Sequence, residues 1–97
     1  MIDLAPEHRA LLVDVFKQHA PAATLYAFGS RTQGLAKPHS DVDILLDSTE
    51  PISMLQRACL RMDLEDSDLP MRVDWHVLQE VPEYLQKQAL PKNIISV

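Results

Sequence analysis

Three short runs rich in β-branched and aromatic residues alternate with longer segments of helical periodicity, and this order most constrains the fold. Strands are expected over 24–28, 41–46 and 72–78, each bounded by glycine, proline or acidic turn residues. Pro6 stands where a first helix can begin, since its missing N–H is not needed in the first turn. The predicted order is α-β-α-β-α-β-α. We therefore expect an α/β (α+β) fold in which helices flank a small mixed sheet.

Helical periodicity predicts an apolar face on two of the intervening segments. In 6–19 this face holds Leu11, Leu12, Val15 and Phe16. In 52–65 it holds Ile52, Leu55, Cys59 and Met62. Shorter helices are expected over 30–35 and 82–90, an acidic loop over 64–70, and a short strand or tail over 93–97.

The size, charge and cysteine content of the chain exclude several classes of protein. With 97 residues it is expected to be a single domain, 1–97. A net charge of −5 argues against direct binding of nucleic acid. Cys59 is the single cysteine, which excludes an internal disulfide. With no signal-peptide pattern and no apolar run of transmembrane length, we expect a cytoplasmic protein without a membrane partner.

Gly29 and Ser30 lie between the first expected strand and a short helical turn. Glycine allows the backbone to approach a ligand closely. The helix start that follows offers free N–H groups and the positive end of a dipole. This arrangement can cradle a phosphate, although Gly-Ser at the end of a strand is also common in ordinary turns.

Asp41 and Asp43 are separated by one residue of the second expected strand. Residues i and i+2 of a strand point to the same side, so the two carboxylates are expected to lie together. Their repulsion raises the pKa of each unless a cation lies between them, and a hard divalent cation prefers such oxygen ligands. Taken alone, the pair is better explained by a loop aspartate next to a solvated edge-strand aspartate.

A third carboxylate, Asp74, interrupts the last expected strand. Aspartate is disfavoured in strands, and its neighbours Val73 and Trp75 are expected to face the core. If the strands are adjacent, Asp74 faces the same side as Asp41 and Asp43. Three carboxylates beside a phosphate cradle predict a two-metal site. His76 shares this side and is interpreted as a polar strand residue rather than a ligand.

The pattern Gly-Ser, ten residues, Asp-x-Asp, followed later by a lone aspartate, resembles the DNA polymerase β-like nucleotidyltransferase superfamily. The resemblance is greatest to its minimal nucleotidyltransferases, many of which are antitoxins paired with HEPN-domain toxins. It spans nearly the whole chain and implies a polymerase β-like nucleotidyltransferase core. Leu35 departs from the small or acidic residue that relatives often carry there, outside the ligand positions.

The resemblance implies a role for each residue of the motif. Gly29 and Ser30 would hold the β- and γ-phosphates of a nucleoside triphosphate, ATP, and Arg31 belongs to the same nucleotide-binding motif. Asp41 and Asp43 would bind two Mg²⁺ ions. Asp74 would share one of these ions and help to activate the acceptor hydroxyl, so that all three aspartates are catalytic.

The small size of the chain bears on the acceptor, because no residues remain for an acceptor domain. The resemblance implies a tyrosine of a HEPN ribonuclease toxin, which is silenced by transfer of AMP. A second hypothesis is an antitoxin that acts by tight complex formation, with catalysis weak or dispensable. A third is nucleotidyl transfer to a small molecule. A homodimer or a hetero-oligomer with the toxin is expected.

Overall fold

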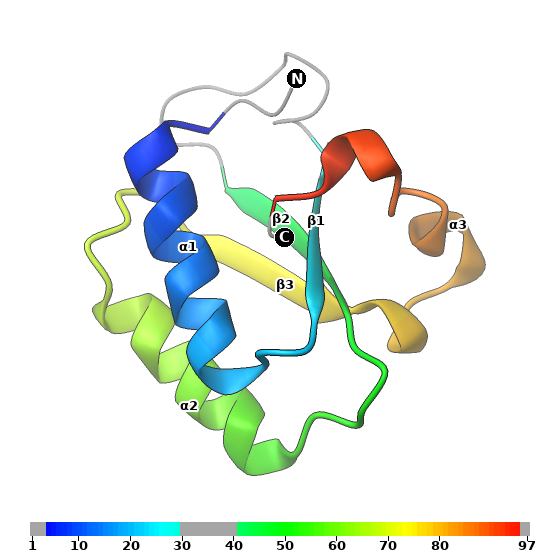
Figure 1. The fold of residues 1–97 in the computed structure, drawn as a ribbon, viewed down its shortest axis with the longest axis horizontal. Coiled ribbons are helices and arrows are strands. Elements are labelled where there is room, and N and C mark those ends of the chain that lie inside the picture. The colour runs from blue at the N-terminus through cyan, green and yellow to red at the C-terminus, as the bar shows by residue number, and fades with distance from the viewer. Residues whose placement is uncertain (1–3, 30–40, 96–97) are drawn as a thin grey trace.

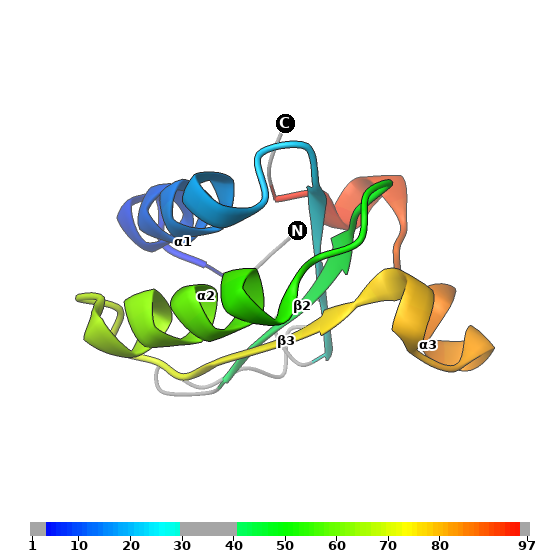
Figure 2. The same cartoon turned by 90° about the horizontal axis from the view of Figure 1, so that it is seen from below.

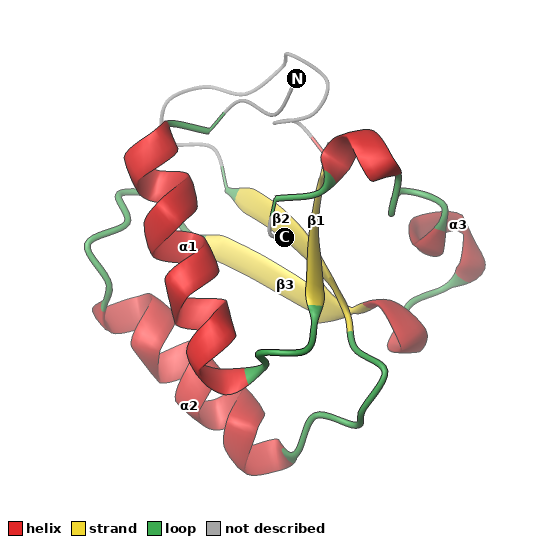
Figure 3. Ribbon diagram, viewed as in Figure 1, coloured by secondary structure: helices red, strands yellow, loops and turns green. Residues whose placement is uncertain are grey.

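The computed structural model describes residues 4–29 and 41–95. Figures 1 and 3 show helices and strands in the predicted order, and the short helix expected over 30–35 lies outside the described residues. The helices are α1 (Pro6–His19), α2 (Met54–Asp66) and the short α3 (Glu83–Gln86), and the 3₁₀ turns are η2 (Leu78–Glu80) and η3 (Pro91–Asn93). The strands are β1 (Thr24–Phe28), β2 (Val42–Asp47) and β3 (Val73–Val77).

The three strands form one small mixed sheet in the order β1-β2-β3. β1 runs antiparallel to β2, and β3 runs parallel to β2. After η3 the chain returns to the outer side of β1, where Ile94 forms an isolated antiparallel bridge with Tyr26 and the Ile95 N–H donates to the Leu25 carbonyl at 2.8 Å. The strand or tail expected over 93–97 is therefore a single bridge in the described residues.

The helices α1 and α2 lie side by side on one face of the sheet (Figure 2). Alternation along the strands directs one set of side chains into the layer between helices and sheet. The central buried members of this core are Leu12, Val15, Phe16, Leu25, Ala27, Val42, Ile44, Leu46 and Leu60. Trp75 packs its ring edge-to-face with Phe16, with ring centroids 6.2 Å apart. The sheet thus has one face covered by the two long helices.

The predicted apolar face of α2 is wrong at Leu55 and Met62, whereas Ile52 is buried as expected. Leu55 and Met62 are 73% and 61% exposed, whereas Leu60 is buried. The helix begins at Met54, so Ile52 precedes it and does not share its phase. The side of α2 that meets α1 also carries polar contacts: the Gln56 side chain donates to the His19 carbonyl at 2.9 Å, and Asp63 contacts the His19 ring at 2.5 Å.

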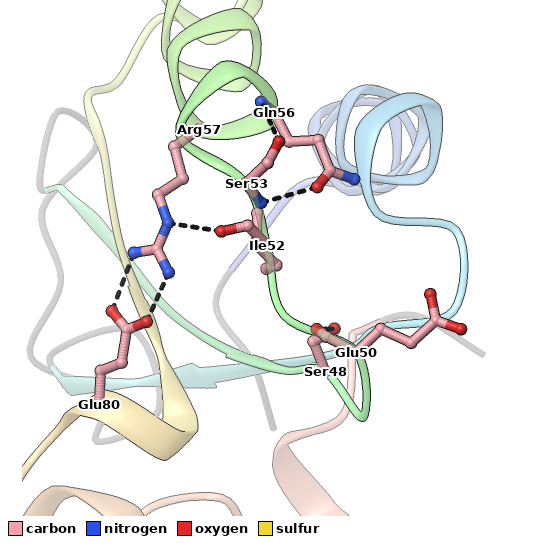
Figure 4. A network of polar contacts seen from close by, with 7 residues as sticks. All are labelled: Ser48, Glu50, Ile52, Ser53, Gln56, Arg57 and Glu80. Carbon is pink, nitrogen blue, oxygen red and sulfur yellow. Dashed lines mark hydrogen bonds and ion pairs between the residues drawn. The ribbon is translucent and has the colours of Figure 1, made fainter.

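A capping box fixes the start of α2 (Figure 4). The Gln56 N–H donates to the Ser53 hydroxyl at 3.0 Å, and the Ser53 N–H donates to the Gln56 side chain at 2.8 Å. Two of the free N–H groups at the helix start are thereby satisfied. Before it, the Ser48 hydroxyl donates to the Glu50 carbonyl at 2.6 Å and forms the turn that leaves β2.

The last helix is shorter than the predicted 82–90. Regular α-helix ends at Gln86, and the N–H groups of Gln88 and Ala89 donate to carbonyls three residues earlier. Such bonds tighten the chain into a turn, which then leads through Pro91 to the bridge beside β1. The helix α2, in contrast, is longer than predicted at its C-terminal end: it continues to Asp66 and includes part of the expected acidic loop.

Candidate active site

Asp43 and Asp74 occupy paired positions on neighbouring strands. The parallel register of β2 and β3 places Asp43 opposite Asp74, and the antiparallel register of β1 and β2 places Phe28 on the other side of Asp43. Both aspartates alternate with core residues, so they lie on the face of the sheet opposite α1 and α2. The sequence predicted this shared side for the two carboxylates.

Burial and charge both act on Asp43. Its pKa is raised above the ordinary value, first by partial burial and then by the negative charges of Asp74 and Asp41, while His76 lowers it to a smaller extent. The three predicted aspartates therefore lie close enough for their charges to interact at Asp43. A group of like charges of this kind is relieved by a bound cation.

Gly29 follows β1 directly and closes one side of this group. Its φ of +78° lies in the left-handed region, which glycine adopts without strain. A Cβ atom at this position would lie 2.5 Å from Oδ2 of Asp43, closer than van der Waals contact allows. The backbone of Gly29 therefore approaches the Asp43 carboxylate as only a residue without a side chain can. The sequence predicted a close approach to a ligand here, and the structure adds the carboxylate.

Among the described residues, His76 lies within ion-pair distance of Asp74. Its Nε2 lies 3.7 Å from Oδ2 of Asp74, and both side chains are about half exposed. The two residues share the open face of the sheet because they are two positions apart on β3. Asp74 is thus open to solvent on the side where an incoming group could reach it, whereas Asp43 is more enclosed.

The donor set of these aspartates fits a hard divalent cation, because carboxylate oxygens are the ligands that Mg²⁺ prefers. Over residues 4–29 and 41–95, no group of three or more His, Cys, Asp or Glu side chains is already arranged around a single point to hold a metal. The charges of Asp41 and Asp74 act on Asp43, but the three carboxylates do not surround a common point. Ser30 and Arg31, the remaining predicted site residues, lie outside the described residues.

Sequence reasoning missed a groove that borders this site. It lies between α2 and β3, has a volume of about 570 Å³, and includes Asp74 and His76 together with Arg57, Arg61 and Arg72. The signal was partial: Arg57 and Arg61 are four residues apart in the expected helix 52–65 and so share one side of it, whereas only the packing of α2 beside β3 adds Arg72.

Residues 11–96 match the family described as Polymerase beta, Nucleotidyltransferase. The chain belongs to this nucleotidyltransferase family. The resemblance inferred from the Gly-Ser and Asp-x-Asp motifs is thereby confirmed at the level of the family, and so is the small mixed α/β fold.

Relatives of this chain include the probable protein adenylyltransferase MntA of Haemophilus influenzae, 41% identical over 73 residues. These residues are 75% of this chain and 64% of that relative, so the chain spans a little under two thirds of its length. Over residues 4–29 and 41–95, none of the helices combines the length and apolar character needed to cross a membrane.

Two solved structures share the fold of this chain. A toxin-antitoxin structure with AMP-PNP superposes with a TM-score of 0.68 and 25% identity, covering 82% of this chain and 64% of that one. A structure described as a minimal nucleotidyltransferase superposes with a TM-score of 0.68 and 27% identity, covering 94% of this chain and 90% of that one. The second match shows that the fold of nearly the whole chain occurs as a minimal unit.

Proposed function

We propose that this protein is a Mg²⁺-dependent nucleotidyltransferase that transfers AMP from ATP to a hydroxyl group of a partner toxin and so acts as its antitoxin. The acceptor proposed is a tyrosine of a HEPN ribonuclease, held in a hetero-oligomer with the antitoxin. The observation that carries the proposal is the pairing of Asp43 with Asp74 beside the close backbone of Gly29, in a chain of the nucleotidyltransferase family. The MntA relative and the toxin-antitoxin structure with AMP-PNP support the nucleotide and the partner.

Each residue of the site has a role in this proposal. Gly29, with Ser30 and Arg31, binds the triphosphate. Asp41, Asp43 and Asp74 hold two Mg²⁺ ions, which when bound neutralise charge on the phosphates and orient the α-phosphate. Holding these cations matters in a chain of net charge −5, which would otherwise repel a polyanion.

The transfer forms one bond and breaks one. The acceptor hydroxyl oxygen bonds to the α-phosphorus, and the bond from that phosphorus to the bridging oxygen of the β-phosphate breaks, so pyrophosphate leaves. Asp74 accepts the hydroxyl proton, a role that suits its exposure on the open face. Asp43, more enclosed and flanked by two other carboxylates, serves as a metal ligand rather than as a base.

The test is incubation of the purified chain with ATP, MgCl₂ and its toxin partner, followed by mass spectrometry of the partner. The expected product is the partner carrying one AMP on a tyrosine. EDTA and the Asp43→Asn variant are expected to abolish the product. A partner of unchanged mass, with Mg²⁺-ATP shown to bind the antitoxin, would contradict the proposal.

A second candidate function is neutralisation of the toxin by binding alone. The observation that favours it is the exposed apolar surface of α2, where Met54, Leu55 and Met62 are all more than half exposed. Such residues are common at protein interfaces. The double variant Asp41→Ala/Asp43→Ala separates the two functions. Under the adenylyltransferase proposal it fails to protect cells from the toxin, and under the binding proposal it still protects them.

A further inference from the structure

The groove between α2 and β3, named here the β3 groove, runs along the outer side of the sheet. Its walls include Arg57, Arg61, Leu64 and Glu65 from α2, Arg72 before β3, Asp74 and Trp75 within β3, and Glu80 after it. Its volume of about 570 Å³ is sufficient for several residues of a peptide. Because Asp74 belongs both to this groove and to the candidate active site, a chain lying in the groove would pass beside the proposed base.

β3 is an edge strand among the described residues, since the sheet order is β1-β2-β3 and only β2 pairs with it. The Val42 N–H donates to the Arg72 carbonyl at 2.9 Å, which sets the phase of the parallel ladder. In a parallel ladder every second residue of a strand directs both its N–H and its C=O to the same neighbouring strand, and the residues between them direct these groups to the opposite side. The N–H and C=O groups of Val73 and Trp75 therefore point away from β2, toward the groove, as a template for another strand.

Two arginines of the β3 groove are without partners among the described residues. Arg57 is fixed by a two-pronged contact with Glu80 and by a bond from its Nε to the Ile52 carbonyl at 3.1 Å (Figure 4). The side chains of Arg61 and Arg72, in contrast, form no hydrogen bond or ion pair with any residue of 4–29 or 41–95. Two free guanidinium groups beside an open strand edge are complementary to carboxylate side chains on an incoming chain.

We propose that the β3 groove docks an extended segment of the partner protein, which adds as a strand along β3 and places carboxylate side chains against Arg61 and Arg72. Side chains of an added strand alternate between the two faces of the sheet. One set would meet α2 and Arg61, and the other would lie beside Asp74 on the open face. A hydroxyl in this second set becomes the acceptor, so the inference rests on the proposed function and defines its substrate as an extended acidic segment.

Trp75 provides a probe for this test, because it is the single tryptophan of the chain and lines the groove. The ligand used is a synthetic peptide of alternating glutamate and valine with a central tyrosine, and the matched peptide carries lysine in place of glutamate. Binding is followed by selective Trp75 fluorescence and by NMR of the backbone amides, without ATP or Mg²⁺. We expect the glutamate peptide to shift the amides of Val73 and Trp75, and the lysine peptide to bind about tenfold more weakly or worse.

The matched variants test the two arginines. Arg61→Glu/Arg72→Glu is expected to weaken the glutamate peptide at least about tenfold. Lys87→Glu, an exposed charge reversal outside the groove, is expected to leave binding unchanged. Equal binding by the double variant, shifts confined to other amides, or no binding at millimolar peptide would each overturn the inference. So would dimerisation of the free chain through β3, shown by sedimentation, because a second copy would then be the occupant.

The docking and the chemistry fail independently. Asp43→Asn is expected to bind the peptide like the wild type even though it transfers no AMP. A wild-type chain that modifies its partner but takes no peptide at β3 would overturn the docking inference and leave the proposed function standing. A chain that binds the peptide at β3 but modifies no partner would overturn the proposed function and leave the docking inference standing.

Discussion

Gly29 touches Asp43 so closely that a Cβ atom on the glycine would lie 2.5 Å from Oδ2 of the aspartate. The contact joins the end of β1 to the carboxylate that faces Asp74 on β3. It also shows why the first half of the Gly-Ser motif and the second half of the Asp-x-Asp motif act together. The Asp43 carboxylate can occupy its position only because Gly29 has no side chain.

Replacing Gly29 by alanine is expected to impair both folding and activity. A left-handed conformation costs an alanine about 1–2 kcal/mol, and the new methyl group displaces the Asp43 carboxylate. We expect the free energy of unfolding to fall by at least that amount and AMP transfer to fall further than the unfolded fraction explains. Urea unfolding and transfer assays on the same preparation measure the two effects. Full activity in Gly29→Ala would show that the carboxylate does not need its observed position.

Asp43→Asn is expected to remove activity without weakening the metal-free fold. The pKa of Asp43 is raised in the folded chain, so the folded state holds this proton to a higher pH than the unfolded state. The stability associated with that proton is present below the ordinary pKa of 3.8 and is lost as the pH rises through the raised value. Asparagine eliminates this loss, so thermal melting at pH 7 is expected to be unchanged or slightly higher, while transfer falls by at least about a hundredfold.

Asp47→Asn is the matched control for this prediction, because Asp47 lies on the same side of the same strand, four residues away. Its Oδ1 accepts a hydrogen bond from the Gln79 side chain at 2.7 Å, and it is remote from the Asp43–Asp74 pair. We expect it to retain transfer and to keep stabilisation by added MgCl₂, which Asp43→Asn is expected to lose. Equal responses of the two variants to MgCl₂ would place the cation elsewhere.

Much of the strand framework could be predicted from local patterns. The Thr24–Phe28 strand was predicted with its observed bounds, and the other two differ by one residue at their ends. Alternation was sufficient to put Asp43 and Asp74 on one side, because the period of a strand leaves only two choices. The adjacency of β2 and β3 was a condition of that prediction, and only the folded chain supplies it.

The helices were less predictable, because tertiary contacts decide their phase and length. The spacing of the apolar residues predicts one buried face of α2. The side that packs on α1 instead contains Gln56 and Asp63, and both contact His19 of α1. The β3 groove is a further example. Arg57 and Arg61, four residues apart, share one side of α2, but only the packing of α2 beside β3 brings Arg72 to them.

Leu60→Ala and Met62→Ala test the corrected phase of α2. Leu60 is 1% exposed in the core and Met62 is 61% exposed, so truncation removes packing only at Leu60. We expect Leu60→Ala to lower the free energy of unfolding by about 2–4 kcal/mol and Met62→Ala by less than about 0.5 kcal/mol. Urea denaturation gives both values. Similar losses for the two variants would restore the face predicted from periodicity.

The ion pair between Arg57 and Glu80 predicts a pH-dependent loss of stability on the acid side. The guanidinium donates through Nη1 to the Glu80 carboxylate at 2.8 Å, and this hydrogen bond is the main reason why the pKa of Glu80 lies below its ordinary value. A lowered pKa in the folded chain means that the contribution is present above the ordinary value of 4.5 and is lost as the pH falls through the lowered one.

Glu80→Gln is therefore expected to lower the melting temperature slightly at pH 7, within the small range of an exposed pair, and to match the wild type at low pH. Glu83→Gln removes an equal charge from the first turn of the short α3 and is expected to leave the difference between pH 7 and low pH unchanged. Arg57→Ala is expected to cost more than Glu80→Gln at every pH, because it also removes the bond to the Ile52 carbonyl that supports the entry to α2. Thermal melts of the four proteins across the acid range test this order. A Glu80→Gln curve parallel to the wild type would show that the pair is not held in solution.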